Sequence, residues 1–222
     1  MARHLQTEIE KLKQRLLALC ATVEKNVAVA TRAIWEQDES RVAEVMGTDH
    51  RIDREEVEVE EECLKILALH QPVAVDLRMI IAILKINNDL ERIGDLAVNI
   101  AERARFLQTQ KLPPEGFEFE EMVDKVMRML RWSVDALVSL DVDLAYRVCA
   151  VDDEVDAMNK KSYEVFGRLT ETGNADPRVL THLLSVSRHL ERIADHATNI
   201  AEDVIYMITG DIVRHKMEDY LG

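Results

Sequence analysis

The chain has 222 residues, of which 47% are hydrophobic and 32% are charged, enough apolar material for a folded core and too much for a disordered protein. Seven glycines and four prolines make about 5% of the chain, against roughly 12% in average proteins, which argues against a turn-rich β-sandwich or barrel. The formal net charge of −14 repels nucleic acids and anionic lipids. Cations and protein surfaces are therefore the expected partners.

The sequence shows no signal for export or for membrane insertion. Cys20, Cys63 and Cys149 are an odd number of cysteines without a C-x-x-C pair, which favours a reducing compartment. The first residues are polar and charged, and no stretch approaches the ~18 consecutive apolar residues of a membrane span. We therefore expect a soluble, cytoplasmic protein.

Apolar residues recur at spacings of three and four along most of the chain, which predicts amphipathic helices. In the first half, a weak break at residues 36–40 and a second break at Pro72 separate three such stretches, because proline disrupts a helix interior. The segment 111–116, which contains Pro113 and Pro114, ends the third stretch and predicts a linker.

The second half of the chain repeats the first. Residues 88–102, NDLERIGDLAVNIAE, and residues 188–202, RHLERIADHATNIAE, are identical at 10 of 15 positions. Breaks at 139–143 and at Pro177 again separate three helices. We therefore expect an all-α fold, a tandem repeat of two antiparallel three-helix bundles with six helices in total. The expected bundles, each with a core of its own, span residues 1–112 and 117–222.

Each half carries two pairs of carboxylates spaced four residues apart, one pair on each of two helices. Like charges at this spacing repel by roughly 0.2–0.5 kcal/mol per pair, so a cation or an arginine is expected beside them. Counted from the turns, both pairs of one half lie at the same level of their hairpin, which predicts one four-carboxylate cluster per half. Oxygen ligands suit Mg²⁺, Ca²⁺, Mn²⁺ and iron. The eight predicted metal ligands are Asp49, Asp53, Glu91 and Asp95 in the first half, and Asp152, Asp156, Glu191 and Asp195 in the second.

A solvated acidic face is the alternative interpretation of these pairs. On a helical wheel, Glu91 and Asp95 point away from the apolar stripe, so a metal site there would be shallow and open to water or to a ligand such as phosphate. Arg54, Arg92 and Arg192 would then compensate the carboxylates. The repetition of all four pairs favours metal binding.

Three histidines, His182, His189 and His196, recur every seven residues on one flank of the last helix, but the first half has none at the equivalent positions. We expect them to be structural, with His189 or His196 as an alternative additional metal ligand. None of the seven histidines follows a glutamate by three residues, as di-metal helical bundles require, and no phosphate-binding loop or nucleophile motif is present. The sequence therefore predicts a non-enzymatic protein.

The third helix is expected to be apolar on two sides near its start. Leu77, Ile81 and Leu84 continue the face that later carries Glu91 and Asp95. A surface helix needs only one apolar side. The second side should therefore pack on the other bundle, on a second subunit or on a partner protein.

Two stretches resemble the PhoU family of bacterial phosphate-specific transport accessory proteins. They are QPVAVDLR at residues 71–78 and the E-R-I-x-D pattern of residues 91–95, which returns at 191–195. The resemblance implies a cytoplasmic negative regulator of phosphate uptake and of the phosphate-starvation (Pho) response. It implies no enzymatic activity and no binding of nucleic acids. It also implies that the protein acts at the inner face of the membrane through partners, namely a sensor histidine kinase and the subunits of the ABC phosphate transporter, and forms a homo-oligomer such as a dimer.

The same resemblance implies multinuclear iron or zinc at two acidic surface sites, formed by the E/D-x-x-x-D motifs to which the eight carboxylates above correspond. Two functions from different classes are compatible with the sequence. In the first, the protein is a regulatory adaptor between the kinase and the transporter. In the second, it is a metal- or phosphate-binding storage or buffering protein whose partners are incidental.

Overall fold

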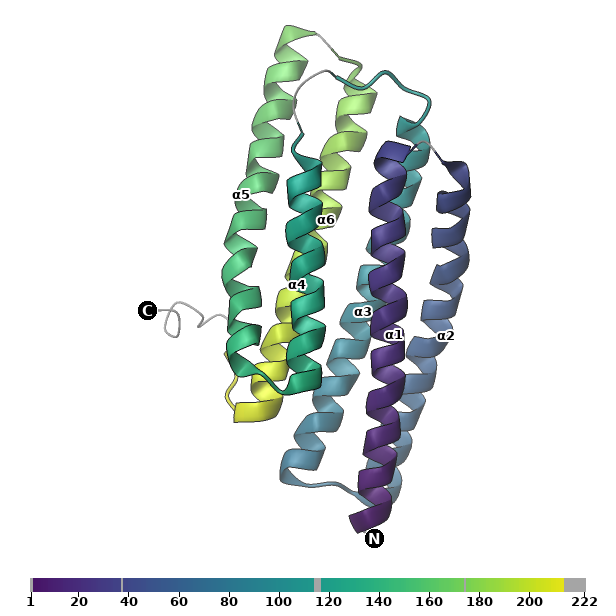
Figure 1. The fold of residues 1–222 in the computed structure, drawn as a ribbon, viewed down its shortest axis with the longest axis vertical. Coiled ribbons are helices and arrows are strands. Elements are labelled where there is room, and N and C mark those ends of the chain that lie inside the picture. Colours follow the sequence, from purple (N-terminus) through teal and green to yellow (C-terminus); the bar gives the residue numbers. More distant parts are fainter. Residues whose placement is uncertain (1, 37, 114–116, 174, 214–222) are drawn as a thin grey trace.

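The computed structural model consists of six long helices that run along one common axis (Figure 1). It describes residues 2–36, 38–113, 117–173 and 175–213, and the described residues contain no strand. The prediction of an all-α fold with six helices is confirmed. The helices are α1 (Ala2–Glu36), α2 (Glu39–His70), α3 (Ala74–Leu107), α4 (Phe119–Ser139), α5 (Val142–Thr172) and α6 (Pro177–Thr209).

Equivalent aspartates begin the second helix of each half. The carboxylate of Asp38 accepts a hydrogen bond from the Ser40 backbone N–H at 2.9 Å, and that of Asp141 accepts one from the Leu144 backbone N–H at 3.0 Å. These side chains satisfy backbone donors that have no partner within the helix. The helices that follow the predicted breaks at residues 36–40 and 139–143 therefore each begin with a side-chain cap.

The second helix of each half, α2 or α5, ends in a different C-terminal cap. The α2 helix ends with Gln71 in the left-handed conformation at φ 44°, directly before Pro72, whereas α5 ends with Gly173 at φ 64°. Glycine adopts this conformation without a steric cost, and glutamine does not. The α6 helix then begins with Pro177 in its first turn, where proline is tolerated.

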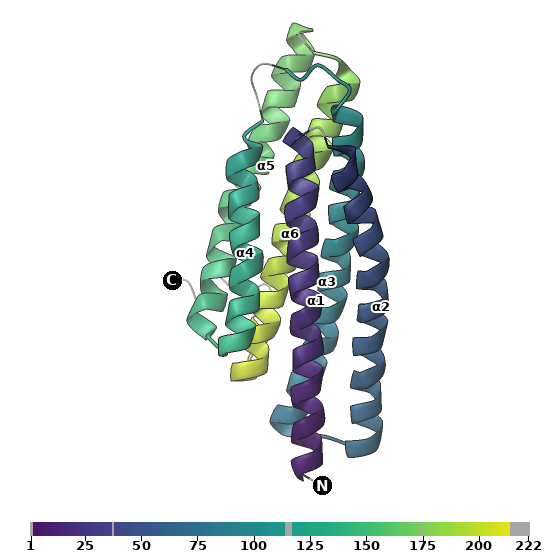
Figure 2. The same cartoon turned by 45° about the vertical axis from the view of Figure 1, so that its right-hand side comes forward.

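The two halves form two bundles that lie side by side, with α3 and α6 antiparallel between them (Figures 1 and 2). The helices α1, α2 and α3 pack together, as do α4, α5 and α6, and the most extensive contact between the halves joins α3 to α6. The prediction of two tandem bundles is confirmed. The expectation of a separate core in each half is wrong, because buried residues of α3 such as Ile93 and of α6 such as Ile193 belong to one continuous apolar cluster.

The second apolar side of α3 faces the other bundle over part of its length. Ile81 lines a small hollow together with Tyr206 of α6, and Leu84 lines a groove together with Asn199 of α6. Leu77, nearer the start of the helix, is 39% exposed. Leu84 packs against the apolar core, and Ile81 is half-buried at the hollow beside α6.

Part of the predicted linker lies outside the described residues, because only Pro113 of the pair Pro113–Pro114 is described. The same holds for residues 214–222 of the second predicted bundle. The bundle limits of 1–112 and 117–222 therefore stay predictions. Within the described part of the chain, none of the helices has the length and apolar character that crossing a bilayer requires.

Candidate metal sites

The acidic cluster of the second half lies between α5 and α6. Asp156 of α5 and Glu191 and Asp195 of α6 each offer an oxygen, and these three atoms lie within 4.8 Å of one another. Partial burial raises the pKa of all three carboxyls, and the neighbouring carboxylates raise those of Glu191 and Asp195 further. The convergence of three oxygens in one place is suited to a cation.

Asp152 extends this cluster into the protein. Burial is the main cause that raises its pKa to about 7, and the negative charges of Asp195 and Asp156 add to the rise. A side-chain hydrogen bond from Thr198 opposes this rise only in part. Because burial and two neighbouring carboxylates disfavour its ionised form, Asp152 is the group of this cluster that a cation would stabilise most.

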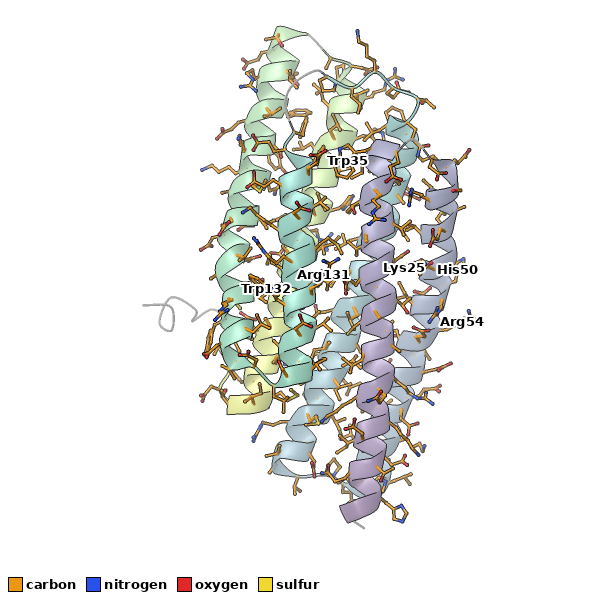
Figure 3. All side chains as sticks on the ribbon, in the orientation of Figure 1. Lys25, Trp35, His50, Arg54, Arg131 and Trp132 are labelled. Atoms are coloured by element: carbon orange, nitrogen blue, oxygen red, sulfur yellow. The ribbon has the colours of Figure 1, made fainter. Side chains whose placement is uncertain are left out.

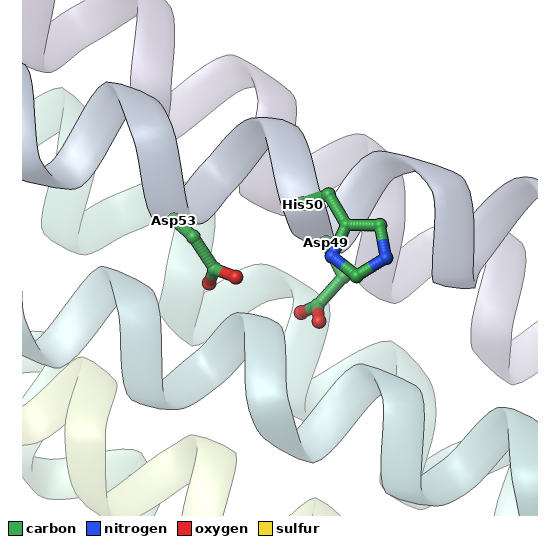
Figure 4. Close-up of side chains that lie close together, drawn as sticks. All are labelled: Asp49, His50 and Asp53. Atoms are coloured by element: carbon green, nitrogen blue, oxygen red, sulfur yellow. The ribbon is translucent and has the colours of Figure 1, made fainter.

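The acidic cluster of the first half has a different composition. Asp49, His50 and Asp53 of α2 each offer a ligand atom, again within 4.8 Å of one another. Figure 4 shows the carboxylates of Asp49 and Asp53 on successive turns of α2, with the imidazole of His50 beside Asp49. The first cluster therefore joins two oxygen ligands to one nitrogen ligand, a set that suits zinc and iron as well as harder cations.

The predicted partners of this cluster on α3 are held by an arginine. Arg92 Nη1 lies 3.2 Å from Asp95 Oδ2, and Arg92 Nε lies 3.3 Å from Glu91 Oε2. Glu91 and Asp95 are therefore not part of the close group that Asp49 and Asp53 form, although the charge of Asp95 contributes to a raised pKa of Asp49. The two pairs share one acidic surface, and the arginine keeps part of it neutral.

Close packing of α2 on α3 brings the two helices together at this level. A Cβ atom on Gly94 would lie 3.3 Å from two side-chain carbons of Ile52 and 3.8 Å from Asp49 Oδ1. Gly94 lies between Glu91 and Asp95 on one helix, and Ile52 lies between Asp49 and Asp53 on the other. The missing side chain of Gly94 thus allows the close approach of the carboxylate-bearing turns.

His50 is the candidate ligand that the sequence analysis missed. It is exposed on the outer side of α2, close to Arg54 (Figure 3), and its position in the second half is occupied by Asp153. A search for features common to both halves cannot find a residue that only one half has. Its place three residues before Asp53 was the available signal, because residues three apart are neighbours on a helix surface.

The three histidines of α6 lie toward α3. His196 Nδ1 is 2.7 Å from Asp89 Oδ1, and the ring of His182 stacks on Phe106 with the ring centroids 3.9 Å apart. Burial lowers the pKa of His189 to about 4, with contributions from nearby arginines. His196 and His182 thus have contacts with α3, and none of the three belongs to a close metal-ligand group of the described residues.

The fold and the two equivalent acidic surfaces define the class to which the chain belongs, that of tandem-repeat proteins built from two three-helix bundles. A model of the PhoU domain matches residues 16–104 and residues 119–204, once in each half. The chain belongs to the PhoU family. The resemblance inferred from the sequence is confirmed.

Relatives match nearly the whole chain. A phosphate-specific transport system accessory protein PhoU homolog of Pseudomonas putida is 40% identical over 97% of this chain and 84% of the relative. A Thermotoga maritima homolog of the same description is 35% identical over 93% of this chain and 90% of the relative.

Solved structures agree with the fold. PhoU from Pseudomonas aeruginosa superimposes with a TM-score of 0.89 at 38% identity, covering 93% of this chain and 99% of that structure. The phosphate transport system regulatory protein PhoU from Streptococcus pneumoniae gives a TM-score of 0.83 at 27% identity, covering 94% and 99%. The chain is thus a member of an accessory and regulatory family of phosphate transport.

Proposed function

We propose that the protein is a non-enzymatic adaptor that restrains phosphate uptake and represses the phosphate-starvation response. The observation that carries the proposal is family membership over both halves of the chain, with relatives described as accessory and regulatory proteins of phosphate transport. In this role it works in the cytoplasm, as a dimer, and contacts a sensor histidine kinase and the ABC phosphate transporter at the inner face of the membrane.

Metal binding at the two acidic clusters is the second part of the proposal. Asp152, Asp156, Glu191 and Asp195 would hold metal in the second half, and Asp49, His50 and Asp53 in the first. A bound cation would cancel the repulsion that raises the pKa of Asp152 and Asp195. Iron and zinc fit the mixed ligand set of the first cluster, and harder cations fit the oxygen-only set of the second.

Storage or buffering of metal is the competing function. The exposure of Asp53, Asp156 and Asp195 favours it, because exposed ligands exchange metal readily with solvent. Metal stoichiometry alone does not separate the two functions, since both need loaded sites. An adaptor must bind specific partner proteins, whereas a metal buffer needs none.

The test is recovery of the full-length protein with the purified transporter ATPase subunit and with the purified kinase cytoplasmic domain, with and without phosphate. An adaptor binds at least one of them at a defined stoichiometry, and phosphate changes the amount bound. A variant with Asp156→Asn, Glu191→Gln and Asp195→Asn shows whether loss of metal weakens that binding. Failure to bind either partner under all conditions, with metal still taken up, would leave only the buffering function.

A further inference from the structure

A groove of about 750 Å³ lies along the contact between α3 and α6 and also reaches α2. Among the described residues that line it, Lys85 is the only cation, and its Nζ is held 2.9 Å from Asp203 Oδ1. Three asparagines and four carboxylates also line the groove, the carboxylates being Glu56 and Glu60 of α2, Asp89 of α3 and Glu202 of α6. The described lining is therefore rich in acceptor oxygens and has no unpaired lysine or arginine. It contains none of the eight predicted metal ligands.

Asn87 of α3 presents an unpaired acceptor beside this groove. The residue is 1% exposed, and its Nδ2 donates hydrogen bonds to the backbone oxygen of Glu56 at 2.9 Å and to Glu56 Oε1 at 3.1 Å. These two acceptors fix the amide, because a carbonyl oxygen in the place of Nδ2 would face two other oxygens. Oδ1 is buried and has no hydrogen-bond partner among the described residues. Buried polar atoms are nearly always hydrogen-bonded, so Oδ1 indicates a donor that comes from a ligand in the groove.

The equivalent pair of residues in the second half is satisfied within the protein. Ser187 and Asn159 occupy the positions of Asn87 and Glu56, and Ser187 Oγ donates a hydrogen bond to Asn159 Oδ1 at 2.9 Å. Within the described parts of the chain, neither residue has a buried polar atom without a partner. Two other carboxylates of the groove have no acidic counterpart, since Glu60 corresponds to Tyr163 and Asp89 to His189. The same helix contact thus forms without an acidic groove or an unpaired acceptor, so the fold requires neither.

The arrangement of the carboxylates favours an extended organic cation over a single metal ion. No three of them form a close group of metal ligands in the part of the chain that the structure describes. Burial raises the pKa of Glu56, and the negative charges of Glu60 and Asp53 raise it further, so added positive charge is stabilising here. Ammonium groups on one flexible chain can pair with separated carboxylates, and their N–H groups suit Asn87 Oδ1. The volume of the groove is in the range of small-ligand sites.

We propose that this groove is a binding site for a linear polyamine, which lies across α2, α3 and α6. One ammonium group donates a hydrogen bond to Asn87 Oδ1 and pairs with the carboxylates of Glu56 and Glu60. A second ammonium group pairs with Glu202 on α6. The bound cation thus connects the first bundle to a helix of the second. The site is independent of the adaptor function and of the metal clusters, because it contains no predicted metal ligand and no residue assigned to a protein partner.

The test is calorimetric titration of the full-length protein with spermidine at fixed ionic strength, after chelation and dialysis. We expect saturable binding at one site per chain. The double variant Glu56→Asn/Asn87→Ser carries the pair found in the second half, and it should weaken spermidine binding at least about tenfold, since it removes charge-assisted contacts. Glu60→Gln, at an exposed position, should weaken it about two- to fivefold. The matched control Glu61→Gln removes the same charge from α2 outside the groove and should leave the affinity unchanged.

A titration with Mn²⁺ separates the groove from the acidic clusters. The double variant should respond to Mn²⁺ as the wild type does, and an equal loss of Mn²⁺ and spermidine binding would overturn a distinct site in the groove. Circular dichroism checks the folding of the double variant, and Glu60→Gln decides the outcome if that variant does not fold. Equal spermidine affinities of the wild type and the folded site variants, or no saturable binding, overturn the proposal. Tighter binding of amidated dilysine, which has the same number of amino groups, overturns the assignment to a free polyamine.

Discussion

The acidic clusters of the two halves occupy equivalent positions on related helices, but they balance their charge differently. In the first half, Arg92 contacts Glu91 and Asp95, and an imidazole lies beside Asp49. In the second half, three carboxylates converge without an arginine in ion-pair contact, as far as the described residues show. The two halves therefore carry negative charge at equivalent positions, but the neighbouring residues neutralise that charge to different extents.

This difference separates the roles that a cation would have in the two clusters. Burial and neighbouring carboxylates raise the pKa of Asp152 to about 7, so the second cluster is the more strained of the two without a counter-ion. The first cluster is partly neutralised by protein side chains and offers a nitrogen ligand. We therefore expect bound metal to stabilise the second cluster more than the first. We expect the first cluster to discriminate more strongly between metal ions.

The largest expected effect is the loss of metal from one half. A variant with Asp156→Asn, Glu191→Gln and Asp195→Asn should weaken metal binding in the second half by more than about 100-fold, since it removes direct ligands and not only their supports. Elemental analysis after dialysis, with the first-half variant Asp49→Asn/Asp53→Asn as the matched control, measures the effect. Unchanged metal content and unchanged melting with added iron or zinc would mean that the acidic faces are merely solvated.

Asp152→Asn should stabilise the metal-free protein at high pH. Folding raises the pKa of the Asp152 carboxyl from 3.8 to about 7. The protein therefore loses stability as the pH rises from about 4 to 7, because the folded state disfavours the ionised carboxylate. Asparagine avoids this loss, so the variant should gain on the order of 1–3 kcal/mol at pH 8 and nothing at pH 4. Denaturant unfolding at both pH values measures the difference.

Asp49→Asn is the equivalent change in the first half. The imidazole of His50 opposes the rise in the pKa of Asp49, so we expect a smaller gain in stability there. A larger gain for Asp49→Asn than for Asp152→Asn would contradict the difference between the clusters. Metal should bind more weakly to both variants.

Exchange of one residue between the halves tests ligand chemistry. His50→Asp gives the first cluster the residue found at position 153, and Asp153→His makes the reverse change. We expect the first variant to lower the affinity for Zn²⁺ relative to Mn²⁺ by about tenfold, and the second to raise it, because imidazole favours zinc over harder cations. Competition titration, each in a protein whose other cluster is disabled, gives the ratio. An unaltered ratio would remove His50 from the ligand set.

The smallest effect is expected from Arg92→Gln. This change frees Glu91 and Asp95 from an exposed arginine, so it should cost less than about 1 kcal/mol of stability and raise the cation affinity of the first cluster about two- to fivefold. Thermal unfolding and calorimetric titration provide the two values. Arg192→Gln in the second half is the comparison, since Arg192 forms no ion pair with the described residues and acts on Glu191 and Asp195 only through its charge. A drop in cation affinity for Arg92→Gln would show that the arginine orders the site.

Much of the architecture could be read directly from local features of the chain. The aspartates at 38 and 141, the prolines at 72 and 177 and the spacing of apolar residues mark helix ends and buried faces through interactions within a few residues. The repeat then predicted the same bundle twice. Separate cores were wrongly expected, because periodicity identifies a buried face without identifying what covers it.

The candidate site was predicted in part. Five of the eight carboxylates belong to close groups of the described residues, Asp49 and Asp53 in the first half and Asp156, Glu191 and Asp195 in the second. The arginine that holds Glu91 and Asp95, and the histidine beside Asp49, depend on side-chain directions that the spacing does not contain. The prediction of the eight as metal ligands remains to be tested by the experiments above.

The sequence by itself determined the helices, their duplication and the placement of carboxylates on one face of each hairpin, because these depend on the helical period and on residues close in the chain. Only the tertiary structure decided that α3 packs on α6. That packing merges two cores into one and pairs Asp89 with His196 across 107 positions of sequence. Such contacts depend on the facing of two distant helices, which no local pattern specifies.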